Sequence, residues 1–183
     1  MTTPEEVLCF WFGADGTFRD VWFAKNALFD TLCARFADTL HAAKQGALDH
    51  WTETPRGSLA LVIVLDQFSR NLFRDSPEAY AADAKARDVA RAAIARGFDL
   101  AVTPTQRIFF YLPFEHSEAL VDQDESVRLF DTLRGVLGDD SAKHAHGHRD
   151  VIRLFGRFPH RNAVLGRTTT SEEAAYLAEH GGF

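Results

Sequence analysis

Signals that start and stop helices recur along this chain, and they restrict its fold more than any other feature of the sequence. Four segments place a Ser or Thr hydroxyl directly before proline or acidic residues. This arrangement caps a helix and complements the positive end of its dipole. The segments lie at residues 3–6, 76–78, 103–104 and 171–173, and Gly13, Gly97 and Gly181 are suited to end three of the helices that follow.

Apolar residues at helical spacing fill the intervals between these signals. In residues 26–46 the spacing of Leu28, Phe29, Leu32, Phe36 and Leu40 predicts one long amphipathic helix. The apolar run at 59–65 fits a strand or a helix, but apolar residues continue at helical spacing through Phe73, and no second strand candidate is available to pair with it. We therefore expect a buried helix at 58–73.

The remaining predicted helices lie at residues 4–13, 76–97, 103–113, 115–137, 143–155 and 171–181, with a loop at 13–20. Together these segments predict an all-α protein of about seven or eight helices. With 183 residues and no hairpin signal, the chain is expected to form a single domain over residues 1–183.

Composition narrows the classes of function. A net charge of −6 argues against nucleic-acid binding, which needs a positive surface. The apolar run at 59–65 is too short to cross a membrane, and the N-terminus does not resemble a signal peptide. Two cysteines, Cys9 and Cys33, are too few for a disulfide framework. We therefore expect a cytoplasmic protein that binds neither membrane nor nucleic acid.

Cationic residues gather at residues 148–167. Arg149, Arg153 and Arg157 recur every four residues, which places them on one face if the segment is helical. Pro159 is expected to end or kink that helix and to turn the residues after it into a loop. The segment ends with His160, Arg161, Asn162 and Arg167. Because a guanidinium fork matches carboxylate and phosphate, the segment predicts an anion-recognition surface.

A second polar segment follows the buried run. Asp66, Arg70 and Arg74 are four residues apart, which predicts a common helix face, and Gln67 and Asn71 lie between them. A buried carboxylate needs a partner. We favour an internal ion pair over a catalytic role for Asp66, whereas ligand contact and salt bridging stay equal alternatives for the two arginines.

A third polar segment follows an aromatic cluster at residues 109–118. Pro113 predicts that Glu115 and Glu118 lie in the first turn of a helix, where carboxylates suit the positive helix end. Alternatively, His116 and Glu118 form an acid/base pair, since imidazole titrates near neutrality. Ser117 beside His116 does not indicate a catalytic triad, because adjacent helical residues point in different directions.

Three histidines lie close together at His144, His146 and His148. The spacing of the first and third suits a metal on a helix, but Gly147 weakens that helix. We expect no metal and no cofactor.

Three strings carry a resemblance to a known family: DQFSRNLFR at 66–74, LPFEHSE at 112–118 with the later Gln123, and FGRFPHRNAVLGR at 155–167 with TSEE after it. They resemble the bacterial domain-of-unknown-function 924 family over nearly the whole chain. The resemblance implies a tetratricopeptide-like right-handed helical stack, with no assigned activity. The family pattern falls on Asp66, Gln67, Arg70, Asn71, Arg74, Pro113, His116, Ser117, Glu118, Gln123, His148, Arg157, Pro159, His160, Arg161, Asn162 and Arg167.

Three functions remain open. The favoured one is a binding module whose groove, lined by Arg, His and Asn, takes a carboxylate or phosphate of a small molecule or peptide. The second is a small-molecule hydrolase or transferase with His116 or His160 as acid/base, oriented by Glu118 or Asp66. The third is an internal ion-pair network that supports protein–protein interaction, and homodimerisation stays open as well.

Overall fold

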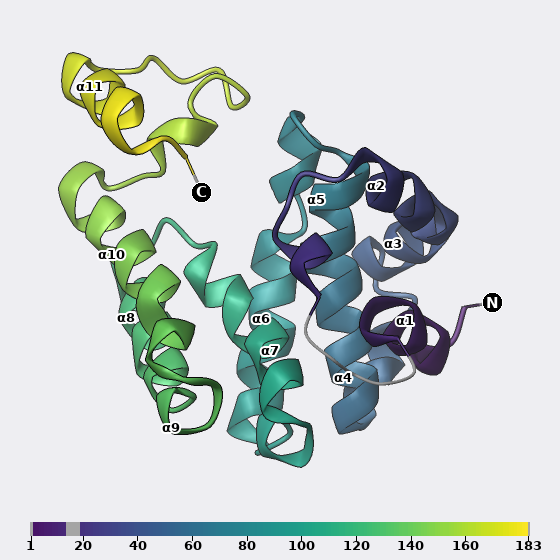
Figure 1. Cartoon of the computed structure of the whole chain (residues 1–183). Coiled ribbons are helices and arrows are strands. Elements are labelled where there is room, and N and C mark those ends of the chain that lie inside the picture. The colour runs from purple at the N-terminus through teal and green to yellow at the C-terminus, as the bar shows by residue number, and fades with distance from the viewer. Residues whose placement is uncertain (1, 14–18, 183) are drawn as a thin grey trace. The chain divides into compact units, whose positions relative to one another are not determined.

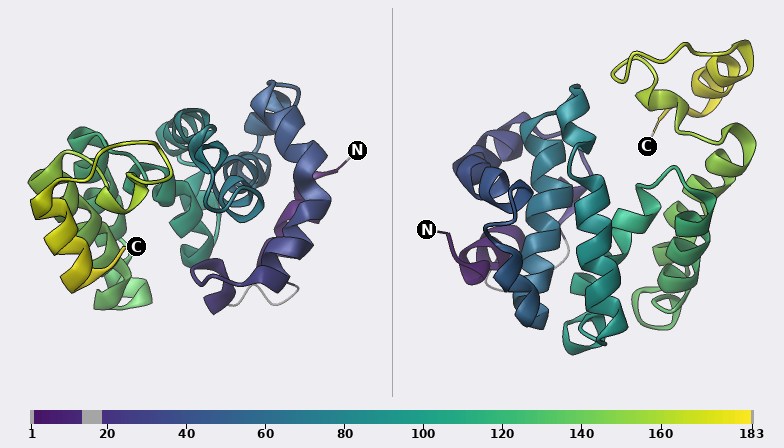
Figure 2. Two further views of the ribbon diagram at one scale, coloured as in Figure 1. Left: turned by 90° about the horizontal axis from the view of Figure 1, so that it is seen from above. Right: turned by 180° about the vertical axis from the view of Figure 1, so that it is seen from behind.

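The fold was obtained as a computed structural model that describes residues 2–13 and 19–182. The chain divides into two compact units, and each is described by itself. Unit 1 comprises Met1–Arg74 and Glu78–Pro113, and unit 2 comprises Asp75–Pro77 and Phe114–Phe183. Both units are helical throughout their described parts (Figures 1 and 2), which confirms the predicted all-α class.

Unit 1 contains six α-helices and most of a seventh. They are α1 (Pro4–Phe12), α2 (Ala27–Cys33), α3 (Ala37–Lys44), α4 (Pro55–Val62), α5 (Ser69–Leu72), α6 (Asp83–Ala95) and α7 (Pro104–Glu115). Short 3-10 turns lie between them at Asp20–Trp22, Ala34–Phe36, Asp49–Glu53, Pro77–Tyr80 and Asp99–Ala101. Of the loop predicted at 13–20, residues 14–18 lie outside the described residues.

Unit 2 follows from the end of α7. Its helices are α8 (Leu120–Asp131), α9 (Arg134–Leu137), α10 (Lys143–Phe155) and α11 (Ser171–His180), with 3-10 turns at Asp139–Ala142 and Pro159–Arg161. Helices α8 and α10 lie side by side in every view (Figures 1 and 2). Val151, Ile152 and Phe158 form a buried apolar cluster here, and Phe155 and Tyr176 pack against it.

The described residues contain more helical segments than the predicted seven or eight because three predicted helices are divided. The segment 26–46 is interrupted by the 3-10 turn Ala34–Phe36, and 58–73 contains a π-helical turn at Ile63–Phe68. The segment 115–137 becomes α8 and α9. The apolar residues of this segment do not all face the core, since Phe29, Phe36 and Leu40 are buried whereas Leu28 and Leu32 are exposed.

The core of unit 1 is built around the apolar run at 59–65. Every residue of that run is completely buried, and it is helical as predicted. The helix begins at Pro55, three residues earlier than predicted, because Thr54 accepts a hydrogen bond from the Gly57 amide and caps it. Trp11 packs on Phe68 and Phe109 at ring-centroid distances of 5.5 and 5.6 Å, so phenylalanine contributes much of this core.

Capping residues correctly predict where the first and the last of the described α-helices begin, to within one residue. Thr3 and Glu6 form a capping box at the start of α1. A second box starts α11, although its capping residue is Thr170 rather than Ser171, paired with Glu173. The segment 76–78 begins only a 3-10 turn, Pro77–Tyr80, and α6 starts later at Asp83.

Two predictions about proline were wrong. Pro113 lies inside α7, which continues to Glu115, so Glu115 ends a helix and Glu118 lies in the link before α8. Helix α10 covers the predicted range, Lys143–Phe155, but Gly156 ends it with a left-handed φ of 67°, rather than Pro159. Arg157 therefore lies outside α10 and does not share a helix face with Arg149 and Arg153.

Within residues 2–13 and 19–182, no helix has both the length and the apolar composition that crossing a membrane requires.

Gly57 lies at a close approach between the start of α4 and the turn before it. A Cβ atom at this position would lie 2.2 Å from the Trp51 carbonyl oxygen, which belongs to the backbone and cannot rotate away. We expect Gly57→Ala to destabilise the fold by about 1–3 kcal/mol through overpacking, although alanine favours helices. Chemical denaturation measures this change.

Gly135 in α9 is the matched control, since a Cβ atom there meets nothing within 4 Å. We expect Gly135→Ala to be neutral or to stabilise by up to about 1 kcal/mol. A loss of stability for Gly135→Ala equal to that for Gly57→Ala would contradict the role assigned to the close approach.

Candidate functional site

Arg70 bridges two carboxylates in unit 1. Its Nη1 donates to Asp66 Oδ1 at 3.1 Å and to Asp83 Oδ1 at 2.8 Å, and its Nη2 donates to Asp83 Oδ2 at 2.9 Å. Burial acts against the charge of Arg70, but Asp66 and Asp83 outweigh it and raise its pKa. Gln67 Nε2 also donates to Asp66 Oδ2 at 2.7 Å. The internal pairing favoured for Asp66 is therefore present.

Asp30 of α2 joins the other predicted residues of unit 1. Arg74 donates to both of its oxygens, from Nε at 2.8 Å and from Nη2 at 2.7 Å, and Asn71 Nδ2 donates at 2.8 Å. Burial tends to raise the pKa of Asp30, but these hydrogen bonds lower it overall. Asp66, Arg70 and Arg74 therefore do not share one helix face as predicted. Arg74 follows the end of α5, and its side chain pairs with Asp30 of α2.

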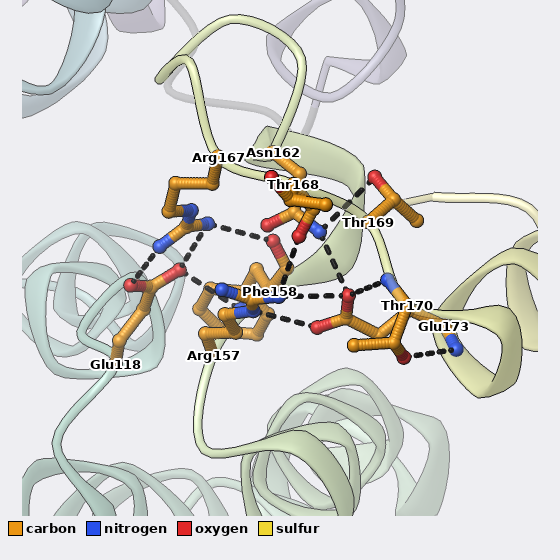
Figure 3. Close-up of polar contacts among 9 residues, drawn as sticks. All are labelled: Glu118, Arg157, Phe158, Asn162, Arg167, Thr168, Thr169, Thr170 and Glu173. Atoms are coloured by element: carbon orange, nitrogen blue, oxygen red, sulfur yellow. Dashed lines mark hydrogen bonds and ion pairs between the residues drawn. The ribbon is translucent and has the colours of Figure 1, made fainter.

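In unit 2, Glu118 holds the chain around Phe158 in place (Figure 3). Arg167 donates to both oxygens of Glu118, at 2.7 and 3.0 Å, and the Phe158 amide donates to Oε1 at 2.8 Å. Arg167 Nη2 also donates to the Phe158 carbonyl at 3.0 Å. Burial tends to raise the pKa of Glu118, but these donors and the charges of Arg167 and Arg161 lower it.

Glu173 anchors α11 in the same way (Figure 3). Arg157 donates two hydrogen bonds to the Glu173 carboxylate, from Nε at 2.6 Å and from Nη2 at 2.9 Å. The same carboxylate accepts from Asn162 Nδ2 at 3.0 Å and from the Thr170 amide at 2.8 Å. The Arg157 hydrogen bond, followed by that of Thr170, lowers the pKa of Glu173 to about 2. Glu173 is the one residue of α11 that is fully buried, with 2% of its surface exposed.

A third group brings Arg161 together with three histidines. Arg161 lies over the Phe158 ring at 4.4 Å, and its Nη1 donates to the His116 carbonyl at 3.0 Å. Burial, above all, lowers the pKa of His148 to about 3 and that of His160 to about 4. The charges of Arg161 and His116 also lower the pKa of both histidines, whereas Glu118 acts in the opposite direction on His160.

Further polar side chains stand close to this group. Gln123 Nε2 donates to the carbonyls of Glu115 and Ser117 at 2.7 and 2.6 Å and so caps the end of α7. His148 Nδ1 lies 2.9 Å from the His144 carbonyl and 3.5 Å from Glu115 Oε1. Oε1 of Gln123 and Oδ1 of Asn162 are buried acceptors without a hydrogen bond to the described residues.

The predicted site residues therefore form separate groups. Asp66, Gln67, Arg70, Asn71 and Arg74 lie in unit 1, and the other predicted residues lie in unit 2. The members in unit 2 are His116, Glu118, Gln123, Arg157, His160, Arg161, Asn162 and Arg167. A groove lined by both sets stays a prediction.

Sequence reasoning singles out Asp66 and Glu118 but misses three other acids that hold the arginines. It assigns Glu173 only to helix capping, and it does not single out Asp30 or Asp83. The capping box from Thr170 to Glu173 was a usable signal for the position of Glu173. For Asp30 and Asp83 the separations to their partners, 44 and 13 residues, left no local signal.

The histidine cluster in α10 does not converge on a metal site. His146 Nε2 lies 3.1 Å from Asp131 Oδ1 and 3.0 Å from Arg134 Nη2, whereas His148 is buried. In the part of the chain that the structure describes, no group of three His, Cys, Asp or Glu side chains is arranged to hold a metal ion.

Fold and site together define a protein that is helical in its described parts and in which half-buried arginines pair with acids of the same chain. The chain belongs to the family DUF924, described as bacterial protein of unknown function, which matches residues 7–181. This confirms the resemblance seen in the sequence.

A solved structure described as the protein of unknown function ATU0120 from Agrobacterium tumefaciens is similar to this chain. The two sequences are 44% identical, the match covers 96% of this chain and 97% of the other, and the TM-score is 0.87. No curated protein matches the chain.

The low pKa of Glu173 predicts a pH-dependent contribution to stability. A carboxylate whose pKa falls from 4.5 to about 2 on folding stabilises the fold above pH 4.5 and loses that effect as the pH falls through 2. We expect Glu173→Gln to lower the melting temperature at pH 7, and its difference from wild type to shrink between pH 4.5 and 2. Melting curves over pH 2–7 measure this.

Glu172→Gln removes the same charge from the exposed neighbouring position, and we expect it to follow the wild-type profile. If the difference between Glu173→Gln and wild type is the same at every pH, the ionised carboxylate is not what fastens α11.

Proposed function

We propose that this chain is a binding module whose unit 2 takes an anionic small molecule or peptide, through a carboxylate or phosphate, beside Arg161, His116, His148 and His160. One observation carries the proposal: the Arg161 guanidinium, which is buried, donates to the His116 carbonyl, and its charge acts on the imidazoles of His148 and His160. A bound anion would be stabilised by the charge and the donors of a guanidinium.

The low pKa values of His148 and His160 support this proposal. Both imidazoles are neutral at pH 7 because they are buried and face Arg161. A neutral imidazole accepts a proton when an anion arrives, and the resulting imidazolium then pairs with that anion. Binding of an anion and protonation of His160 are therefore coupled.

The proposal also includes a cytoplasmic location and a tetratricopeptide-like stack of helices. Cys9 and Cys33 are free thiols, as is usual for proteins in a reducing compartment, which supports a cytoplasmic location. The tetratricopeptide-like stack implied by the family resemblance is part of the same proposal, since such stacks commonly act as binding surfaces.

We favour the binding module over an enzymatic function with His116 or His160 as acid/base. Glu118 was the carboxylate expected to orient a histidine, but Arg167 and the Phe158 amide already hold both of its oxygens. A base with a pKa near 4, as His160 has, is also weak at neutral pH.

A second candidate function is an internal ion-pair framework that supports protein–protein interaction. It is favoured because four arginines donate hydrogen bonds of 2.6–3.1 Å to carboxylates of the same chain. They are Arg70, Arg74, Arg157 and Arg167. On this proposal those four arginines are structural, and anion recognition is confined to the group around Arg161.

Inorganic phosphate is the probe for the anion site. We expect saturating phosphate to raise the pKa of His160 by about 1–3 units, as a nearby opposite charge does. Nuclear magnetic resonance titration of the imidazole C–H signals measures it, with chloride at equal ionic strength as the reference. Arg161→Lys keeps the charge but loses the fork, and we expect it to weaken phosphate binding.

Arg153→Lys on the exposed side of α10 is the control and should bind phosphate as wild type does. If the pKa of His160 is the same in phosphate and chloride, or if Arg161→Lys and Arg153→Lys bind phosphate equally, the proposed anion site is wrong.

The framework candidate is tested at Arg70. Its side chain is 19% exposed and that of Asp66 is 1% exposed, so Arg70→Ala leaves a buried carboxylate without its guanidinium. We expect a loss of about 3–5 kcal/mol in the free energy of unfolding. The exposed Arg91–Asp88 pair is the control, and Arg91→Ala should change stability by less than about 0.5 kcal/mol. Equal effects would contradict a framework role.

A further inference from the structure

Helix α11 is held to the rest of unit 2 mainly through one charged side chain. Of its ten residues only Glu173 is buried, and the half-buried Tyr176 packs on Phe155 at a ring-centroid distance of 5.3 Å. Helix α10, by comparison, has four buried residues. Because a segment with few buried apolar contacts has low local stability, α11 depends strongly on the hydrogen bonds of Glu173.

A pocket of about 470 Å³ lies beside the start of α11. It is lined by residues from the end of α10 and from the first turn of α11, namely Leu154, Phe155, Arg157, Thr170, Glu172 and Glu173. The apolar surfaces of the two helices are therefore not closely packed at this end. The guanidinium fork of Arg157 joins them instead, through its two hydrogen bonds to Glu173.

The link that leads into α11 is suited to act as a hinge. It begins after Arg167, whose side chain is fixed by Glu118 without any part of α11. Residues 168–170 follow, and they are exposed and belong to no helix or turn. A change in the backbone angles of these residues would move α11 while Arg167 stays in place.

Arg157 and Asn162 hold this hinge as well as the helix. In addition to their bonds to Glu173, Arg157 Nη2 donates to the Thr168 carbonyl at 2.9 Å, and Asn162 Nδ2 donates to the Thr169 hydroxyl at 3.3 Å (Figure 3). The hydrogen bonds from residues 168–173 to the rest of unit 2 therefore pass through two side chains. One of them, Asn162, directly follows the arginine of the proposed anion site.

The other end of the segment lies against His160. Helix α11 packs on the turn Pro159–Arg161, which carries this histidine (Figures 1 and 2). Beyond α11 the backbone of Gly182 approaches so closely that an added Cβ atom would lie 2.9 Å from His160 Cβ and 3.2 Å from His160 Cγ. The half-buried His160 is thus covered in part by the chain that follows α11.

We propose that residues 168–182 form a lid over His160, and that the ionised Glu173 carboxylate is the latch that keeps the lid closed. An anion then reaches His160 and Arg161 only while Glu173 is released. The inference rests on the anion site proposed above, because it names how access to that site is controlled. Lids are drawn from the least stable parts of a fold, and α11 with its single buried residue is such a part.

Hydrogen exchange at the imidazole C2 position tests the lid without any ligand. Mass spectrometry measures this exchange for each histidine, and a covered ring exchanges slowly. We expect Glu173→Gln to speed the exchange of His160 by about tenfold or more, because losing hydrogen bonds between charged groups raises the open population by such a factor. The backbone amides of α11 should exchange faster as well. The exposed His50 of unit 1 should exchange equally in both proteins.

Glu172→Gln and Gly182→Ala complete the set of variants. Glu172→Gln removes a charge from the exposed position next to the latch and should leave the exchange of His160 unchanged. Gly182→Ala places a methyl group against His160 and does not touch Glu173. It should speed C2 exchange of His160 by about fivefold or more through overpacking, whereas the amides at the start of α11 exchange as in wild type.

Inorganic phosphate tests whether the lid controls entry. Line shapes of the His160 C–H signal in nuclear magnetic resonance give the association rate of phosphate. We expect Glu173→Gln to raise this rate by about the same factor as it speeds C2 exchange, since both processes need the open lid. Glu172→Gln should bind phosphate at the wild-type rate.

Three results would overturn the lid. In the first, Glu173→Gln speeds amide exchange in α11 but not C2 exchange of His160, so α11 does not cover that ring. In the second, Glu173→Gln changes neither exchange, so Glu173 is not the latch. In the third, C2 exchange is faster but phosphate associates at the wild-type rate. Absence of phosphate binding to wild type and every variant would instead contradict the anion site, while the exchange data still decide whether α11 covers His160.

Discussion

A buried carboxylate needs a cation, and the described parts of both units meet that need with arginine. The side chains of Asp66 and Glu173 are only 1% and 3% exposed, and removing such an ion from water costs several kcal/mol unless a partner restores the lost interactions. Arg70 meets Asp66 and Asp83, Arg74 meets Asp30, and Arg157 meets Glu173. The first two arginines join the region of α5 to α6 and to α2, and the third fastens α11. These ion pairs therefore tie together segments that lie apart in the sequence.

The same pairing bears on the proposed anion site. An arginine whose fork already holds a carboxylate of its own chain attracts a second anion weakly, because its charge is compensated at close range. The proposed site is accordingly not placed at Arg70, Arg74, Arg157 or Arg167, each of which holds an Asp or Glu side chain.

The sequence by itself determined the all-α class, the family, the buried helix through residues 59–65 and the capped starts of α1 and α11, because these follow from local capping and apolar spacing. Local signals misjudged Pro113, which α7 accommodates, and the role of Pro159, because Gly156 ends α10. The spacing of Asp66 and Arg70 indicated their pairing, whereas the acids that Arg74 and Arg157 meet were decided by tertiary structure. Asp30 and Arg74 are 44 residues apart, and only the packing of α2 on α5 brings them within hydrogen-bond distance, because no local signal links residues so far apart in the chain.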